Sequence, residues 1–338
     1  MRALTRTVLP LSQEEDDVFF SDDEFASDDA YAFTASPARP PAAASADSRR
    51  RSRSMSLDKR RSLTLERTYW QNGMAELFLV RGAGYLTAQG PTAAFKVPAT
   101  RAAFSLGGVD FFSLPADSSS REHLACHPAS WLSRASAMHR ARLGGASLPA
   151  AFVLQFMNPG APGRFPKTSL ALYFIAADGA SFAELLARGG PLGAVLRRFL
   201  ELRDNEERSE RGKMLKLIPS LAPSSPALIR AVVPARAPCL IGTCVRTATY
   251  CMPEGAPPEE TQYVEVDVDV GSAAIADRFF RHLFHRLAGR VVLDLALLLE
   301  GSREEELPEQ LLGVAHIANV GPALAVPLPV AQARGAHT

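Results

Sequence analysis

The sequence has little cysteine, no excess of either charge and no long apolar run. Only 4 cysteines occur in 338 residues and none belongs to a CxxC pair, so we expect reduced thiols. Lysine and arginine total 37 against 36 aspartate and glutamate, which excludes a globally basic nucleic-acid-binding protein. The longest strongly apolar stretch, 291–299, is far shorter than the roughly 20 residues of a membrane-spanning helix.

Targeting and catalytic signatures are also missing. The N-terminus is too poor in apolar residues for a secretory signal, so we expect a cytoplasmic protein. The sequence contains no GxSxG nucleophile elbow, no GxxxxGK[ST] phosphate-binding loop and no HExxH zinc helix. We therefore predict a non-enzymatic protein, and we assign it no cofactor.

The first 65 residues separate charge into opposite blocks. Nine acidic residues lie in 14–29 and seven cationic residues in 49–61, and a proline- and alanine-rich spacer at 36–46 divides them. Such a segment offers no periodic apolar face that could pack. We predict a disordered regulatory tail over 1–65 and a disordered C-terminal tail over 323–338.

A folded domain is predicted over 66–322. Short apolar segments punctuated by glycine and proline are typical of strands, and two helical patterns are grouped between them. This order favours an α+β fold, with a largely antiparallel sheet packed by a few helices. The expected strands are 77–80, 108–113, 152–157, 170–176, 228–233, 245–250, 263–270, 291–299 and 314–319, and the expected helices are 181–202, broken near 189–191, and 272–288.

The alternating segment YVEVDVDVGS predicts a strand with valines on one face and three carboxylates on the other. Glu265, Asp267 and Asp269 could hold Ca²⁺ or Mg²⁺, or could act as paired acids and bases in an unrecognised enzyme. The favoured interpretation is a solvated strand face, or ion pairs with neighbouring arginines, because one strand alone closes no coordination shell. We assign no metal here.

Two histidine groups invite a metal interpretation. His123, Cys126 and His127 lie within five residues, and His282 and His285 are spaced three apart on a cationic helix face. Zinc requires a closed set of four ligands, and no second pair of suitable spacing follows. We interpret these residues as structural or surface groups.

Several separated motifs together resemble one family. They are FLVRGAGYL at Phe78, GGVDFF at Gly107, HPASWL at His127, FVLQFMNPG at Phe152, SLALYF at Ser169, KLIPSL at Lys216, LIGTC at Leu240, YVEVDVDVGSAAIA at Tyr263, VVLDLALLLEG at Val291 and EEELPEQLLG at Glu304. In this order they resemble the C-terminal domain of the plant Enhanced Disease Resistance protein 2 type. The resemblance implies a plant or algal protein whose larger relatives join this domain to a phosphoinositide-binding module and a lipid-binding START module, and the first 65 residues hold neither.

The acidic tail block resembles a short motif that binds the VAP receptors of the endoplasmic reticulum. Its residues here would be Phe19, Phe20, Ser21 and Glu24. Acids would steer the segment to a basic receptor face, and the phenylalanines would fill apolar pockets. Phosphorylation of Ser21 could supply a missing negative charge. The alternative is a solvated tail without a receptor.

The basic tail block predicts regulation by phosphate. Ser52, Ser54 and Ser56 each follow an arginine by three positions, as substrates of basophilic kinases do. The same cations could contact anionic lipid at about 1 kcal/mol each near a membrane, or could serve as a nuclear-localisation signal. The residues expected to contact lipid are Arg49, Arg50, Arg51, Arg53, Arg278, Arg281 and Arg286.

These observations lead to one favoured hypothesis and one alternative. We expect a lipid-associated or membrane-contact protein, peripheral at the endoplasmic reticulum or another membrane, with a VAP-type receptor and a basophilic kinase as partners and no nucleic acid. The alternative is a protein-interaction or signalling module that binds no lipid.

Overall fold

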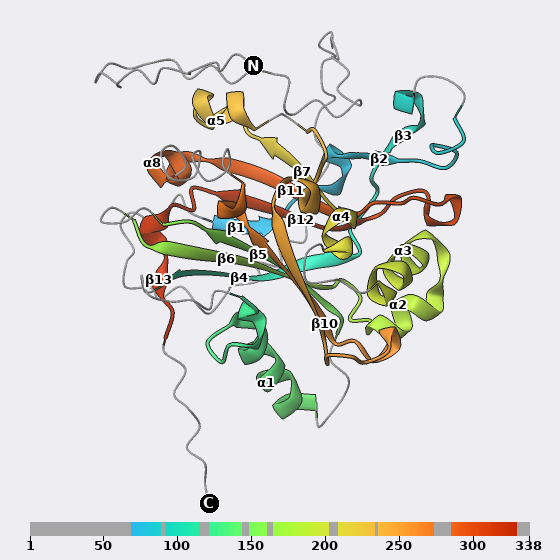
Figure 1. Cartoon of the computed structure of the whole chain (residues 1–338), viewed down its shortest axis with the longest axis horizontal. Helices are drawn as coiled ribbons and strands as arrows, with labels where there is room; N and C mark the ends of the chain where they lie inside the picture. The colour runs from blue at the N-terminus through green and yellow to red at the C-terminus, as the bar shows by residue number, and fades with distance from the viewer. Residues whose placement is uncertain are drawn as a thin grey trace, which may run out of the picture. The chain divides into compact units, whose positions relative to one another are not determined.

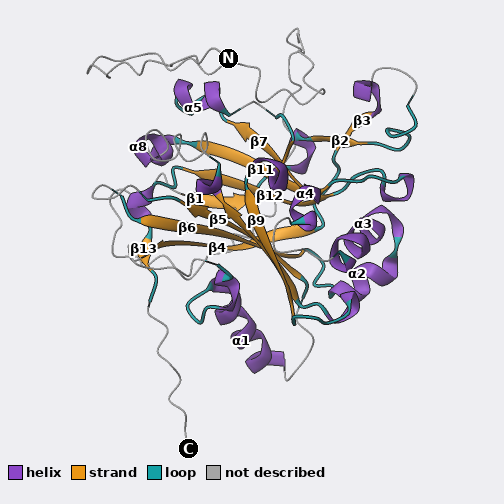
Figure 2. Cartoon of the chain, in the orientation of Figure 1, coloured by secondary structure: helices purple, strands orange, loops and turns teal. Residues whose placement is uncertain are grey.

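A computed structural model describes residues 69–88, 92–114, 122–143, 149–160, 165–202, 209–233, 236–273 and 285–329. Within these ranges two large β-sheets form the centre, and the helices lie outside them (Figure 1, Figure 2). Nothing in this part of the chain is a helix long and apolar enough to cross a membrane.

The first sheet has five strands, and all its pairings are antiparallel. In spatial order they are β1 (Tyr69–Asn72), β12 (Leu311–Ala318), β11 (Val292–Leu299), β7 (Leu215–Leu221) and β8 (Cys239–Leu240). A separate two-stranded ribbon pairs β2 (Leu79–Arg81) with β3 (Lys96–Pro98).

The second sheet has six strands. In spatial order they are β13 (Val326–Pro327), β4 (Phe104–Leu114), β6 (Lys167–Ala176), β5 (Ala151–Asn158), β10 (Tyr263–Asp269) and β9 (Arg246–Met252). Only β10 with β5 and β13 with β4 pair in parallel among the described strands. The largely antiparallel α+β architecture predicted from the sequence is therefore confirmed.

The main core lies between the two sheets. Phe152 and Phe174 of the second sheet and Leu297 of the first belong to one buried apolar cluster, and Phe199 joins it from a helix. The rings of Phe152 and Phe199 are 6.0 Å apart. Full burial of each such side chain contributes roughly 1.5 to 3 kcal/mol, so this layer carries much of the stability.

The helices lie at the ends and on the outer faces of the sheets (Figure 1). The α-helices are α1 (Trp131–Leu143), α2 (Phe182–Arg188), α3 (Gly190–Glu201), α4 (Glu210–Met214), α5 (Ala227–Val232), α6 (Ile241–Cys244) and α8 (His285–Leu287). The 3-10 helices are η4 (Ala75–Leu77), η5 (Thr92–Phe95), η6 (Leu124–Cys126), η7 (Pro258–Glu260), η8 (Val270–Ser272), η10 (Ala288–Arg290), η11 (Glu304–Glu306) and η12 (Pro322–Leu324).

Helix α1 and the turn η6 cover the outer face of the second sheet. Leu124 and Leu132 pack there against Val153 and Tyr173, in an apolar cluster separate from the main core. A Cβ atom on Gly108 of β4 would lie 2.4 Å from the Trp131 ring. Glycine at this position therefore lets the helix sit close to the strand.

Most of the expected elements are confirmed, and one is wrong. The helix pattern at 181–202 is broken into α2 and α3, where Ser181 caps α2 and Pro191 follows the first residue of α3. The segment 228–233, expected to be a strand, is instead helix α5, which begins directly after Pro226 and buries Ile229. Most of the helix expected at 272–288 lies outside the described residues, and its end is α8.

Candidate functional site

Two carboxylates of strand β10 lie fully buried beneath the turn η6. Strict alternation sends Val264 and Val266 into the main core and turns Glu265 and Asp267 to the opposite face. Both carboxylates are 0% exposed. The interpretation as a solvated face is therefore wrong, because a segment remote in the sequence covers this side of the strand as well.

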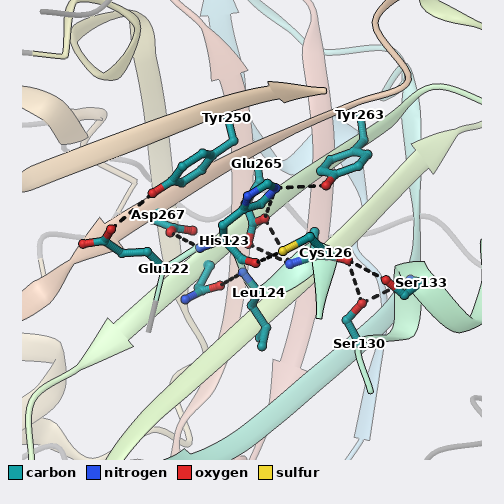
Figure 3. A network of polar contacts seen from close by, with 12 residues as sticks. Glu122, His123, Leu124, Cys126, Ser130, Ser133, Tyr250, Tyr263, Glu265 and Asp267 are labelled. Carbon is teal, nitrogen blue, oxygen red and sulfur yellow. Dashed lines mark hydrogen bonds and ion pairs between the residues drawn. The ribbon is translucent and has the colours of Figure 1, made fainter. Parts of the chain in front are cut away.

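Three consecutive backbone N–H groups of that segment point at the sheet (Figure 3). The amide of His123 donates to Asp267 Oδ2 at 2.8 Å, and that of Leu124 donates to Gln155 Oε1 at 3.3 Å. The amide of Ala125 donates to both oxygens of Glu265, at 3.1 and 3.0 Å. His123 has a φ of 55°, a left-handed conformation that lets successive amides converge.

The His123 side chain closes the site on its solvent side. Its ring stacks on Tyr250, with centroids 4.3 Å apart and planes 4° apart. Its Nε2 lies 2.9 Å from the Tyr263 hydroxyl and 3.7 Å from Glu265 Oε2. Tyr250 in turn donates to Glu122 at 3.3 Å. These side chains complete a layered polar group, which we call the acid cluster: Glu122, His123, Gln155, Tyr250, Tyr263, Glu265 and Asp267.

Burial sets the protonation of the acid cluster. Neither Glu265 nor Asp267 forms an ion pair with a lysine or arginine in the described part of the chain. Burial raises the pKa of Asp267 to about 7, against the hydrogen bond from His123. Burial and the neighbouring charge of Asp267 raise the pKa of Glu265 well above its usual range. Burial also lowers the pKa of His123. Burial therefore favours the protonated over the charged form of both carboxyl groups.

A third buried acid anchors helix α1 beside this cluster. Asp110 Oδ2 accepts the backbone N–H of Trp131 at 2.5 Å, and its other oxygen lies 3.4 Å from Nη2 of Arg134. Burial raises the pKa of Asp110. The hydroxyls of Ser130 and Ser133 both donate to the carbonyl oxygen of Ala125. Helix α1 and η6 are thus tied into one cover.

A second polar group, which we call the ion-pair network, fixes the loop after β11. Lys216 Nζ lies 2.7 Å from Glu309 and 3.2 Å from Glu300, and Arg198 Nε lies 2.5 Å from Glu306. Arg81 adds an ion pair with Glu300 at 2.8 Å. Two of these carboxylates belong to the EEELPEQLLG motif, so that motif has a structural role in this fold.

The residues singled out for metal binding have other contacts. Cys126 is exposed, and its thiol donates to the carbonyl oxygen of His123 at 3.0 Å. His127 Nδ1 accepts from the amide of Ala129, and Asp269 accepts the amide of Gly271. In the ranges given above, no group of three or more histidine, cysteine, aspartate or glutamate side chains could hold a metal ion.

Most of the residues predicted to bind partners lie outside the described residues. Arg286 is described and exposed on α8. Those outside the described ranges are Phe19, Phe20, Ser21, Glu24, Arg49, Arg50, Arg51, Ser52, Arg53, Ser54, Ser56, Arg278 and Arg281. His282, which we interpreted as a surface residue, also lies outside them. Sequence reasoning missed four members of the acid cluster, which are Glu122, Gln155, Tyr250 and Tyr263, although the aromatic residue at the start of the carboxylate strand was a usable signal.

The chain is thus a two-sheet α+β domain whose outer sheet face holds buried acids beneath a helical cover. It belongs to the family described as Protein ENHANCED DISEASE RESISTANCE 2, C-terminal, whose family model matches residues 70–321. A relative named Protein ENHANCED DISEASE RESISTANCE 2-like, from Arabidopsis thaliana, is 33% identical over 128 residues. The match covers 38% of this chain and 16% of that relative. No solved structure matches this chain. The resemblance inferred from the motifs is confirmed.

Proposed function

We propose that this chain is a non-enzymatic lipid-associated or membrane-contact protein, with an N-terminal segment regulated by phosphorylation. The observation that carries the proposal is a concentration of exposed apolar side chains on and around the ribbon of β2 and β3. Leu79 is 57% exposed and Val97 is 40% exposed on these neighbouring strands. Met74 and Leu86, which flank β2 in sequence, are also exposed.

This concentration is unusual for the described part of the molecule. Four of the eight exposed large apolar side chains there fall within 74–97. The ladder pairs Leu79 with Pro98 and Val97 with Val80, which turns Leu79 and Val97 to opposite faces of the ribbon. We therefore propose that the ribbon as a whole, and not one flat patch, contacts the partner or membrane. Lys96 lies next to Val97, and the exposed Arg101 follows β3. Apolar side chains beside cations suit the interface of an anionic bilayer.

The enclosure of the acid cluster supports a non-enzymatic role. A catalytic acid or base must come within hydrogen-bond reach of its substrate. Glu265 and Asp267 are 0% exposed, and backbone amides of the 123–125 segment occupy three of their four oxygens. A substrate would have to displace η6 to reach either carboxyl group.

Vesicle flotation of the full chain tests the lipid proposal. We expect binding to phosphatidylcholine vesicles that contain phosphatidylserine and weaker binding to phosphatidylcholine alone. Leu79→Asp should reduce binding by about tenfold or more, because burial of one leucine contributes roughly 1.5 to 3 kcal/mol. Leu228→Asp is the matched control, since Leu228 is 61% exposed on the separate helix α5. If the wild-type chain floats with neither vesicle, the proposal is wrong and a protein-interaction module is favoured.

The N-terminal segment supplies the regulated part of the proposal. Arg49, Arg50, Arg51 and Arg53 would add electrostatic attraction, which phosphate on Ser52, Ser54 and Ser56 would cancel. Glutamate at these three serines should weaken vesicle binding and reduce its salt dependence. Binding that survives the three glutamates undiminished would rule out this switch.

We also propose a VAP-type receptor of the endoplasmic reticulum as a partner. A peptide covering residues 12–30 should bind such a receptor through Phe19 and Phe20, and more tightly once Ser21 carries phosphate, because added charge strengthens an acid-dependent encounter. Titration with and without phosphate measures this. Undetectable binding by both peptides would contradict it.

A further inference from the structure

Two cysteine side chains meet at the outer edge of the first sheet. Cys239 belongs to strand β8, and Cys244 ends the helix α6 that follows directly. Their Sγ atoms lie 3.2 Å apart. Cys244 is exposed and Cys239 is half-buried, so a small molecule in solution can reach the pair. The lack of a CxxC spacing hid this pair in the sequence.

Contacts of the surrounding backbone hold the two sulfurs together. Cys239 pairs with Leu217 of β7 in the antiparallel ladder, which places the first sulfur. The Thr243 hydroxyl donates to the carbonyl oxygen of Leu240 at 2.7 Å and closes the turn. A Cβ atom on Gly242 would lie 2.4 Å from the carbonyl carbon of Gly212, so α6 rests directly on α4. The proximity of the thiols is therefore built into the fold.

The two thiols differ in acidity. The hydrogen bond from the Cys239 thiol lowers the pKa of Cys244 to about 6, against the effect of burial. The same hydrogen bond, together with burial, raises the pKa of Cys239. Burial and the charge of Glu265 raise the pKa of Cys126. Cys244 is thus the more acidic thiol of the pair, and the thiolate that it forms is the nucleophile in disulfide chemistry.

We propose that Cys239 and Cys244 form a dithiol site for thiol–disulfide exchange with low-molecular-weight disulfides of the glutathione type. Sγ of Cys244 attacks one sulfur of the external disulfide, forms a mixed disulfide and releases the first thiolate with the bonding electron pair. Cys239 then loses its proton and attacks Sγ of Cys244, and the second external thiolate leaves. The external disulfide is reduced to two thiols, which take up the two cysteine protons, and the cysteine pair is oxidised to one disulfide.

Equilibration of the full chain in mixtures of glutathione and its disulfide tests the proposal. After acid quenching and alkylation, peptide mass spectrometry should find an intramolecular link between Cys239 and Cys244. Its fraction should rise with the proportion of glutathione disulfide and fall back on reduction. In Cys239→Ser the resolving thiol is absent, so glutathione should stay attached to Cys244. Separate glutathione adducts on both cysteines of the wild-type chain, or no modification of either, would overturn the proposal.

The rate of alkylation distinguishes a reactive pair of thiols from a pair with a structural role alone, because a structural pair would not make Cys244 react faster. In Cys239→Ser, whose hydroxyl still donates to Cys244, alkylation of Cys244 at pH 7 should be at least about 4-fold faster than that of the exposed Cys126, after allowing for the lower nucleophilicity of a more acidic thiol. Cys239→Ala removes the donor and should shift the alkylation midpoint to higher pH. Equal rates at Cys244 and Cys126, or the same midpoint in both variants, would contradict the proposal.

Discussion

The acid cluster and the ion-pair network both bury carboxylates, but only the network provides cations for them. Lys216 and Arg198 lie within 2.7 and 2.5 Å of their carboxylates. Burial alone would raise the pKa of Glu306, yet the hydrogen bonds from Arg198 and from nearby amides hold it below its usual range. In the acid cluster, backbone amides are the main donors, and burial raises the pKa of Asp267. The partner therefore decides whether a buried acid stays charged.

Glu309→Gln should have the largest effect on stability. It leaves the ammonium of Lys216, whose side chain is only 6% exposed, with Glu300 alone. Breaking a buried ion pair by removing one partner costs about 3 to 5 kcal/mol, and we expect a loss in the free energy of unfolding near 3 kcal/mol. Urea unfolding measures it. The control is Asp178→Asn, which breaks an exposed pair with Arg188 and should change stability little. An equal loss of unfolding free energy in Glu309→Gln and Asp178→Asn would contradict the expected difference between a buried and an exposed ion pair.

Asp267→Asn should have a smaller effect that depends on pH. Burial raises the pKa of Asp267 to about 7 in the folded chain, whereas the ordinary pKa of an aspartate, which we take for the unfolded chain, is 3.8. The contribution of Asp267 to the free energy of unfolding of the wild-type chain is therefore largest at low pH, and it falls as the pH rises from 3.8 to about 7. Between pH 5 and 8 the variant should gain roughly 2 to 3 kcal/mol relative to wild type.

Comparing stability against pH for the wild-type chain and for Asp267→Asn separates the effect of Asp267 from the effects of the titrating groups around it. His123 acts in the opposite direction, because its lowered pKa removes stability as pH falls below about 6.5. Glu122, Cys126, Tyr250, Tyr263 and Glu265 face the same site and remain in both chains. Asp269→Asn, on the same strand, should keep the wild-type profile. Parallel profiles for wild type and Asp267→Asn would show that Asp267 is charged throughout.

Arg134→Gln should have the smallest effect. Asp110 is buried, but the Arg134 side chain that pairs with it is 43% exposed and 3.4 Å away. Such a partly solvated pair contributes less than about 1 kcal/mol. Urea unfolding at neutral pH checks this value. If Arg134→Gln lost as much unfolding free energy as Glu309→Gln, the pair of Asp110 and Arg134 would contribute as much as a buried pair of the ion-pair network.

The sequence predicted the elements of the fold better than the environment of the site. Alternation in 263–270 and the glycine and proline break near 189–191 are local signals, and both produced correct elements. The prediction of a strand at 228–233 was wrong. The valines and isoleucine of this segment suit a strand, whereas Pro226 and the burial of Ile229 against the domain favour a helix. Tertiary packing can override such weak local preferences.

The burial of Glu265 could not be read from its own strand. A solvated carboxylate face and a covered one have the same alternating pattern. The cover comes from His123, Leu124 and Ala125. Ala125 and Glu265, which are joined by a hydrogen bond, lie 140 residues apart in the sequence. Only the folded arrangement brings their backbone amides to the carboxylates, and backbone donors have no residue-type signature.

The close contact between Gly108 and the Trp131 ring predicts that the two positions change together in evolution. Any side chain larger than hydrogen at position 108 would collide with the ring, and a smaller residue at 131 would leave a void above the strand. We therefore expect a substitution at position 108 or 131 to be accompanied by a substitution at the other position. Relatives that keep the tryptophan should keep the glycine, and this pairing is a mark by which sequences with the same helical cover can be recognised.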